Sequence, residues 1–422
     1  MIAHRPLCRT ATRPWICALQ CVVAAAALFS SSVQAQIAVR GKTVYTMAGD
    51  PVEDGVVVVE DGKIVAIGAA PQINVPDGYE VLEAEVVTPG LIDAHSAVGL
   101  TGILNYDHDQ DQLERSQAMQ PELRAVDAYN PHEELIDWVR SFGVTTMHTG
   151  HAPGELISGQ TFVVKTTGNT VEDATVVEAM AVAVSLGPLA EKEGGKSPGT
   201  RGKMMSMLRA ELIRAQEYAA KQAAATEDEE SETTPARDLR LEALSRVLDG
   251  ELKLMITANR AQDIASALRL AHEFNVTLWL DGAAEAYLLI DEIKAADVPV
   301  IIHPTMMRAF GERENLSYET AATLVHAGIP VALQSGYEAY VPKTRVVLFE
   351  AGVAAGHGLS FDEALATITI DAAKILGIDQ RVGSLEIGKD GDLALYDGDP
   401  FEYTSHCVGV VIDGEVVSDV VR

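Results

Sequence analysis

The sequence has few aromatic residues, few basic residues and little cysteine. Aromatic side chains make up 5% of the 422 residues, and 32 Lys and Arg stand against 61 Asp and Glu, giving a formal net charge of −29. A surface with this excess of acid repels phosphate backbones and anionic lipids, which excludes nucleic acid as an expected partner. The expected partner is a small-molecule substrate or ligand, and the oligomeric state does not follow from the composition.

The sequence also lacks an apolar run long enough to span a bilayer, which takes about 20 residues. Its longest run, over residues 15–29, follows Arg5, Arg9 and Arg13 and precedes small residues at 33–35. This order is typical of a secretory signal peptide, and a membrane anchor is the alternative. We therefore expect residues 1–35 to be removed, no membrane span to remain, and the mature chain to be periplasmic or secreted.

Removal of that segment would also remove most of the cysteine. Three of the four cysteines precede residue 22, and Cys407 is the only later one. A single thiol cannot form an internal disulfide, so an exported chain of this size must depend on its hydrophobic core.

Both ends of the remaining chain contain short β-type runs separated by turns. Asp61-Gly62 lies between two β-branched runs near the N-terminus, and Asp413-Gly414 does so near the C-terminus. Such turn pairs are typical of β-hairpins. The pattern predicts one small β-sandwich domain assembled from both termini, from residues 36–88 and 383–422.

The central residues 89–382 alternate helix-like and strand-like segments. Helical spacing occurs at 131–142, 203–224, 242–248 and 263–274. A strand-like segment occurs at 144–148, and largely apolar strand-like runs occur at 253–256, 276–280, 298–302 and 329–333. Apolar strands alternating with helices indicate an α/β fold in which helices cover a parallel sheet, and the length suits a (β/α)8 TIM-like barrel. The acidic segment 226–235 is predicted to be a solvated loop.

Two motifs carry a resemblance to a known family. Residues 87–97 read Val-Thr-Pro-Gly-Leu-Ile-Asp-Ala-His-Ser-Ala, and residues 382–393 read Val-Gly-Ser-Leu-Glu-Ile-Gly-Lys-Asp-Gly-Asp-Leu. The first resembles the opening barrel strand of the amidohydrolase superfamily, and the second is similar to the segment with which these proteins re-enter their β domain. Together they bracket nearly the whole predicted barrel, in the order that the family uses, and they are most similar to the imidazolonepropionase-like branch.

The resemblance implies a metal-dependent hydrolase acting on carbon–nitrogen bonds of cyclic or linear non-peptide amides. In such enzymes Zn²⁺ or a similar divalent ion lowers the pKa of bound water and so supplies hydroxide near neutral pH. Alternate residues on a strand face the same way, so His95 and residue 97 would point into the site together. The family has histidine at both places, whereas this sequence has Ala97 at the second.

Other ligand positions implied by the resemblance also carry different residues. The fifth-strand histidine falls on Thr257, the sixth-strand histidine on Asp281, and the last-strand aspartate on a segment that includes Ser335. The bridging lysine would be Lys165, unless the fourth strand is 179–184, which has no lysine. Because Ala, Thr and Ser cannot replace imidazole and carboxylate ligands, the usual site is predicted to be lost at Ala97, Thr257 and Ser335, and the chain could hold no metal.

A rebuilt metal site is one hypothesis that follows. His95, His148, His303 and Asp281 should lie near the C-terminal ends of barrel strands, where active sites of this fold are built. Asp281 and His303 are then the candidate catalytic residues, and the alternative is that all four are satisfied polar residues lining a pocket. Two functions stay open: an exported amidohydrolase, or a catalytically inactive barrel, a pseudoenzyme, that binds a ligand or partner.

Overall fold

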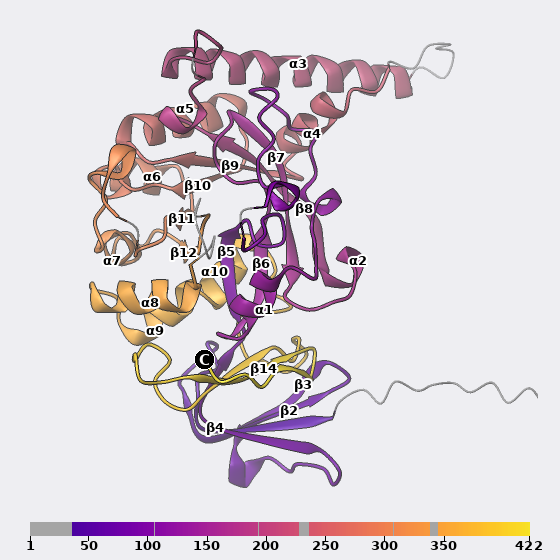
Figure 1. Ribbon diagram of the computed structural model, residues 1–422, viewed down its shortest axis with the longest axis vertical. Helices are drawn as coiled ribbons and strands as arrows, with labels where there is room; N and C mark the ends of the chain where they lie inside the picture. The colour runs from indigo at the N-terminus through magenta and orange to yellow at the C-terminus, as the bar shows by residue number, and fades with distance from the viewer. Residues whose placement is uncertain (1–35, 105, 193, 228–235, 307, 338–344) are drawn as a thin grey trace, which may run out of the picture. The chain divides into compact units, whose positions relative to one another are not determined.

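The computed structural model describes residues 36–104, 106–192, 194–227, 236–306, 308–337 and 345–422. The predicted signal peptide lies outside the described residues, as do residues 228–235 of the predicted acidic loop. Within the described ranges, no helix combines the length and the apolar character that a bilayer crossing requires. Two sheets organise these residues (Figure 1).

The first sheet is built from both ends of the chain, which confirms the predicted composite β domain. Its order is β15-β14-β13-β4-β1-β2-β3. The strands are β1 Ile37–Val44, β2 Val52–Glu60, β3 Lys63–Ala69, β4 Glu80–Pro89, β13 Leu393–Tyr396, β14 Cys407–Ile412 and β15 Glu415–Ser418. β4 lies between the two halves because it pairs parallel to β1 and antiparallel to β13. Apolar residues such as Val39, Val57 and Leu395 form one buried cluster across this junction.

The second sheet is the predicted barrel. Its strands follow chain order: β5 Leu91–Ser96, β6 Val144–Thr149, β7 Ile157–Lys165, β8 Thr175–Ser185, β9 Lys253–Ala258, β10 Leu278–Gly282, β11 Val300–Ile302 and β12 Val331–Leu333. A bridge between Ser96 and Gly336 brings the last strand back to the first. The (β/α)8-type architecture is therefore confirmed.

One strand runs against the others. β7 is antiparallel to both β6 and β8. A parallel connection needs a crossover of about a dozen residues or more, whereas only residues 150–156 separate β6 from β7. The chain is therefore too short at this point for a covering helix, and the strand direction reverses.

Helices cover the outside of the barrel (Figure 1). They are α1 Glu134–Arg140, α2 Val171–Ala174, α3 Arg201–Glu227, α4 Leu239–Leu248, α5 Ala261–Phe274, α6 Ile290–Ala295, α7 Thr320–His326, α8 Val347–Gly356, α9 Phe361–Thr367 and α10 Ile370–Leu376. Short 3-10 turns occur at Ala70–Gln72, Asp107–Asp109, Ala125–Asp127, Pro188–Ala190, Ala286–Leu288 and Gly311–Arg313. The segments predicted to be helical at 131–142, 203–224, 242–248 and 263–274 correspond to α1, α3, α4 and α5, and α1 is shorter than predicted.

Strand periodicity sets which side chains enter the barrel. Residues that face the covering helices belong to one buried cluster, which includes Ile256, Leu280, Ile302 and Leu333. Residues that face inward belong to another, which includes Met255, Trp279, Ile301 and Ala332. Because successive side chains alternate, the positions two residues beyond the inward set share its face at the C-terminal ends of the strands: Thr257, Asp281, His303 and Gln334.

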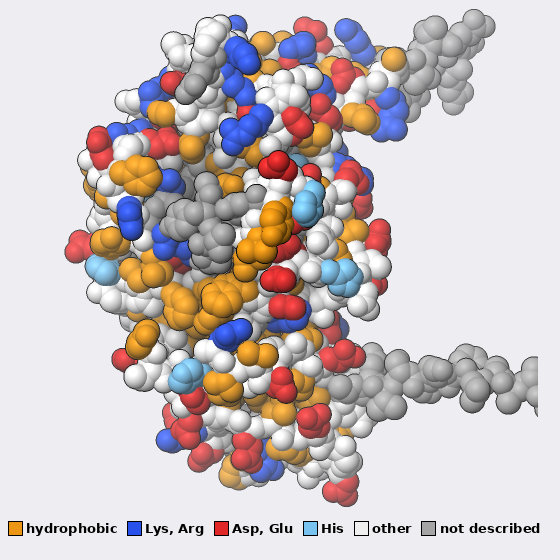
Figure 2. Space-filling view, viewed as in Figure 1, with side chains coloured by type: hydrophobic (Ala, Val, Ile, Leu, Met, Phe, Trp, Pro, Cys, Tyr) orange, Lys and Arg blue, Asp and Glu red, His pale blue; other side chains and the backbone are white. Residues whose placement is uncertain are grey.

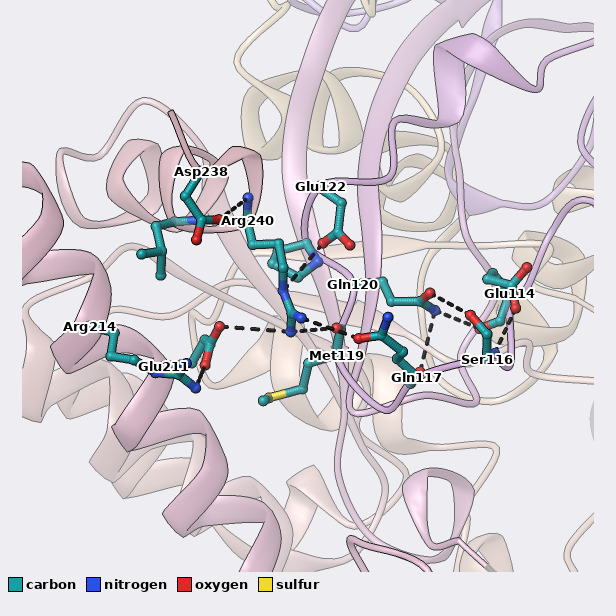
Figure 3. Close-up of polar contacts among 12 residues, drawn as sticks. Glu114, Ser116, Gln117, Met119, Gln120, Glu122, Glu211, Arg214, Asp238 and Arg240 are labelled. Atoms are coloured by element: carbon teal, nitrogen blue, oxygen red, sulfur yellow. Dashed lines mark hydrogen bonds and ion pairs between the residues drawn. The ribbon is translucent and has the colours of Figure 1, made fainter. Parts of the chain in front are cut away.

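Arg240, on α4, ties the α3–α4 helix pair to the long connection between β5 and α1 (Figure 3). Its guanidinium donates to the Met119 carbonyl at 2.8 Å and to Gln117 Oε1 at 3.2 Å. On the other side it lies 3.8 Å from Glu211 on α3, whose side chain is 2% exposed. Residues 114–122 are therefore held against these two helices.

Gly90 marks the passage from the first sheet into the barrel. Its N–H donates to the Asp392 carbonyl at 2.9 Å. A Cβ at this position would lie 2.2 Å from Thr145 Oγ1 on β6, closer than any real contact. The glycine of the opening motif is therefore required by close packing between β5 and β6.

Candidate functional site

A cavity of about 580 Å³ lies at the C-terminal ends of the barrel strands. The inward-facing residues identified above line it, with contributions from the end of β5 and from the segment after β9. They include His95, Thr257, Asn259, Asp281, His303 and Gln334. This is the end of the barrel at which enzymes of this architecture place their active sites.

His95 and Asp281 form a buried ion pair across the cavity floor. His95 Nδ1 lies 2.8 Å from Asp281 Oδ1, and both side chains are less than 5% exposed. Burial opposes the charged imidazole, but the charge and hydrogen bond of Asp281 outweigh it and raise the pKa of His95. Burial likewise opposes ionisation of Asp281, but His95 and further hydrogen bonds lower its pKa. The pairing therefore favours the charged form of each partner.

Two further donors complete the surroundings of Asp281. Thr257 Oγ1 donates to its Oδ2 at 2.5 Å, and Gln334 Nε2 donates to its Oδ1 at 2.7 Å. With His95, three donors from the ends of three strands converge on one carboxylate. Asp281 is thereby held in a fixed orientation, and its lone pairs are largely committed within the protein.

His148 lies beside His95, with ring centroids 5.8 Å apart, but its nitrogens are occupied. Nδ1 donates to the Ala94 carbonyl at 2.7 Å, and Nε2 accepts from Thr161 Oγ1 at 2.6 Å. Burial, with the nearby charge of His95, lowers the pKa of His148 to about 3. His148 is a neutral ring built into the barrel wall.

His303 differs from the other two histidines because one of its nitrogens is uncommitted. Nδ1 donates to the Pro304 carbonyl at 2.8 Å, which leaves Nε2 as the bare acceptor. Nε2 is buried and has no hydrogen-bond partner among the described residues. Burial lowers the pKa of His303 to about 4, and the charge of Arg313 acts in the same direction. The cavity therefore contains a neutral imidazole with a free lone pair.

Gln334 and Ser335, the residues after β12, form hydrogen bonds with different carboxylates. Gln334 reaches Asp281, whereas the Ser335 hydroxyl and backbone N–H both donate to Asp93. Gln334, not Ser335, therefore faces the position where the family's aspartate would act. Burial raises the pKa of Asp93 to about 6 in spite of these bonds.

The tentative placement of a bridging lysine at Lys165 is wrong. Because β7 is reversed, Lys165 points to the junction with the first sheet, where it pairs with Asp390 at 2.8 Å, Asp392 at 3.0 Å and Asp413 at 2.5 Å. The strand that precedes β9 in the barrel is β8, over Thr175–Ser185, which contains no lysine. The alternative placement of the fourth strand is the one that the structure supports.

The donor set does not fit the family's metal ion. Zn²⁺ requires about four strong donors, at least three of them from protein. His148 has no free nitrogen, His95 is held by Asp281, and Asp281 is held by three donors. Across the described ranges, no group of three or more His, Cys, Asp or Glu side chains is placed to hold a metal ion. The structure brings His95, Asp281 and His303 to one cavity with His148 behind them, but without a shared coordination point.

Several cavity residues were not identified from the sequence. Asn259 follows β9, Arg308 and Arg313 follow β11, and Arg345 follows β12. A usable signal was present, because polar residues just beyond the ends of parallel strands gather at one end of a barrel.

Comparisons with known proteins agree with this architecture. The model of the Amidohydrolase family matches residues 287–418. An amidohydrolase of Hapsidospora irregularis is 25% identical over 406 residues, covering 86% of this chain and 40% of that protein. An imidazolonepropionase of Rhizorhabdus wittichii is 27% identical over 419 residues, covering 85% and 92% of the two chains.

A solved structure gives the strongest of these likenesses. The crystal structure of an amidohydrolase from Thermotoga maritima matches with a TM-score of 0.86 and 28% sequence identity, covering 91% of this chain and 100% of that one. The sequence motifs, the barrel with its two-ended β domain, and these similarities agree. The chain belongs to the amidohydrolase superfamily.

Proposed function

We propose that this chain hydrolyses a carbon–nitrogen bond of a small cyclic or linear amide held in the barrel cavity. Membership of the amidohydrolase superfamily supports hydrolysis. The observation that carries the proposal is His303, a neutral imidazole that lines a cavity large enough for a small molecule and whose buried Nε2 has no hydrogen-bond partner among the described residues.

In this proposal His303 is the general base. Nε2 takes a proton from a water molecule as the water oxygen attacks the amide carbon, and the proton then passes to the departing nitrogen as the C–N bond breaks. Asn259 lines the same cavity, and its amide N–H can donate to the oxygen that becomes negative. A base with a pKa near 4 is weak, so turnover is expected to be slow. No step is assigned to a metal, because the donor set does not fit one.

The test is an assay of the mature protein against cyclic amides, N-acyl amino acids and dipeptides, with and without added Zn²⁺ or Mn²⁺. We expect turnover without added metal, and a loss of about 100-fold in His303→Gln, in the range of general-base contributions. His357→Gln is the matched control because His357 is exposed at the end of α8. Turnover that survives His303→Gln, or that requires metal, contradicts the proposed role.

A second candidate function is ligand binding without catalysis. It is favoured by the commitment of His95, His148 and Asp281 to contacts within the protein, since these are the side chains that a hydrolase would use. Saturable binding of a panel compound with no product over a long incubation would support this function instead.

We also propose that the protein is exported, with residues 1–35 as the signal peptide. The support is the order of basic, apolar and small residues in that segment. N-terminal sequencing of protein from a fractionated native host should give a chain beginning near Gln36 in the periplasm or medium. A full-length chain in the cytoplasmic fraction would contradict export.

A further inference from the structure

We propose that Leu189 is a specificity-determining residue, which forms with Pro153 and Ala97 an apolar wall for an aliphatic side chain of the ligand. The inference deepens the function proposed above by naming a ligand class, a neutral amide that carries a branched aliphatic group. It rests on that proposed function for the orientation of the amide in the cavity, but binding to the wall does not require that the molecule be hydrolysed.

The two halves of the barrel contribute different side chains to the cavity. Among the described lining residues, the charged ones other than His95 lie in β10 or follow β11 and β12, and His95 is paired with Asp281. The half from β5 to β8 contributes, beside His95, mostly apolar residues: Ser96, Ala97, Ala152, Pro153 and Leu189. The Ser96 hydroxyl already accepts from the Val98 N–H at 3.2 Å. The cavity therefore has a polar half and an apolar half.

Hydrogen bonds join the segments of the apolar half into one wall. The Gly150 N–H donates to the Ser96 carbonyl at 3.1 Å, which ties the end of β5 to the start of the β6–β7 connection. The Gly154 N–H, at the other side of that connection, donates to Ser185 Oγ at 3.2 Å, at the end of β8. The segments that carry the apolar lining are therefore held next to one another from β5 to β8.

Leu189 lies on a 3-10 turn whose shape is fixed by its surroundings. The turn is Pro188–Ala190, in which Ala190 is fully buried while Leu189 is partly exposed and lines the cavity. The chain enters this turn through Gly187 at φ +81°, where a Cβ would lie 2.8 Å from Asp263 Oδ2. Glycine is the residue that suits both the backbone conformation and the close approach. The buried alanine and this glycine anchor the turn, and the turn presents Leu189 to the cavity.

The division of the cavity orients a bound amide. His303 and Asn259, which the proposed function places at the C–N bond, belong to the polar half. An amide group held there leaves the rest of the molecule to face the wall that includes Leu189. Apolar surface removed from water stabilises a complex roughly in proportion to its area. The wall therefore favours an amide with a branched aliphatic group over the same amide without one, and a cavity of about 580 Å³ has room for both parts.

The test uses a series of neutral amides, so that ligand charge cannot contribute to the differences. The probes are N-acetyl-glycinamide, N-acetyl-alaninamide and N-acetyl-leucinamide, which differ only in the side chain. Titration calorimetry on the mature chain should show the leucine compound binding at least about tenfold more tightly than the glycine compound, as expected for burial of most of an isobutyl group. The heat capacity change of binding should also be most negative for the leucine compound, because burial of apolar surface makes it negative.

Substitutions locate the effect on the wall. Leu189→Asn, which replaces the apolar side chain by a polar one of similar shape, should remove most of the preference for the leucine compound, and Pro153→Ser should reduce it. Hydrophobic side chains also lie among charged ones on the outer surface, as Figure 2 shows, so binding there must be distinguished from binding in the cavity. Leu239→Asn is the matched control, because Leu239 is 60% exposed at the start of α4, and it should leave the preference intact.

Circular dichroism verifies the folding of each variant, and if Leu189→Asn does not fold, Pro153→Ser decides, since Pro153 is partly exposed. Equal binding of the three amides, including no binding of any, overturns the proposal, as does a preference that survives in every folded wall variant. A preference without hydrolysis contradicts only the catalytic proposal. Hydrolysis without a preference contradicts only the role of Leu189.

Discussion

Asp281 and His303 end neighbouring barrel strands on the same inward face, yet their surroundings are opposite. Asp281 receives three donors, whereas His303 has a nitrogen with no partner among the described residues. A buried polar atom without a partner costs free energy. That cost is reasonable at a binding surface, where a ligand or water supplies the missing bond, and this is why His303 carries the functional proposal.

Glu350 is a second residue whose environment has a measurable consequence. It lies in the first turn of α8 and holds the segment after His303 by accepting from Thr305 Oγ1 at 2.7 Å and from the Met306 N–H at 2.8 Å. Burial raises its pKa from 4.5 to about 7. Above pH 4.5 the unfolded chain loses this proton while the folded chain keeps it, so stability falls as pH rises to about 7 and then levels off.

We predict that Glu350→Gln removes the part of the pH dependence of stability that comes from Glu350. A shift of this size corresponds to at most about 3 kcal/mol. Urea unfolding at pH 5 and pH 8 should therefore show a smaller loss of stability for the variant than for the wild type. Glu415→Gln, at an exposed position on β15, is the control and should follow the wild type. Equal pH dependence in wild type and Glu350→Gln would show that Glu350 is not protonated in the folded state.

At the scale of elements, Arg240 determines how firmly the α3–α4 pair holds the connection between β5 and α1. We predict that Arg240→Ala lowers stability by about 1–2 kcal/mol, because it removes bonds to Met119 and Gln117 and leaves buried Glu211 with fewer partners. Hydrogen exchange should accelerate in residues 114–122. Arg209→Ala is the matched control, since Arg209 pairs with Glu273 on an exposed surface. Unchanged exchange in residues 114–122 would count against the anchoring role.

A buried lysine, Lys165, lies at the junction between the two sheets. Lys165 is 5% exposed and pairs with three aspartates of the C-terminal segment, of which Asp392 is buried and has a pKa raised to about 6. We predict that Lys165→Met lowers the free energy of unfolding by about 3–5 kcal/mol at pH 8, because it leaves a buried charge without a partner. This loss of stability should be smaller at pH 5, where Asp392 takes up a proton.

The control for this prediction is Lys42→Met, which removes an ion pair with Glu85 in which both side chains are mostly exposed. Exposed pairs contribute less than about 1 kcal/mol. Chemical unfolding at the two pH values measures both variants. A loss for Lys165→Met as small as that for Lys42→Met would show that the junction does not depend on this cluster.

The sequence was sufficient to predict part of the barrel, namely β6, β9–β12 and the helices α1, α3, α4 and α5, but not the direction of β7. A strand-like segment after a predicted helix located β6, apolar runs located β9–β12, and strand periodicity placed Asp281 and His303 at the correct end of the barrel. The reversal of β7 was missed because it depends on a connection too short for a helix. Two consequences were missed with it: Lys165 points to the sheet junction, and Thr161 on β7 occupies His148 Nε2.

At the scale of the whole molecule, the sequence could not predict which side chains of the site pair with one another. His95 and Asp281 are 186 positions apart, and the sequence contains nothing local that commits one to the other. Ala97 and Thr257 stand where the family resemblance implies histidine. In the structure, the His95–Asp281 pair and its flanking hydroxyl and amide donors fill the floor of the cavity.

This arrangement leads to a prediction about metal. A ligand that binds only the folded state at 100 times its Kd stabilises it by about 2.7 kcal/mol, which would appear as a clear rise in Tm. Because His95, His148 and Asp281 are committed to one another and to their neighbours, we expect neither Zn²⁺ nor EDTA to shift Tm, and elemental analysis of dialysed protein to find well under one ion per chain. Should Zn²⁺ raise Tm in the wild type but not in His95→Ala, these side chains must rearrange to coordinate an ion, and the ion pair would be only the metal-free state of a working metal centre.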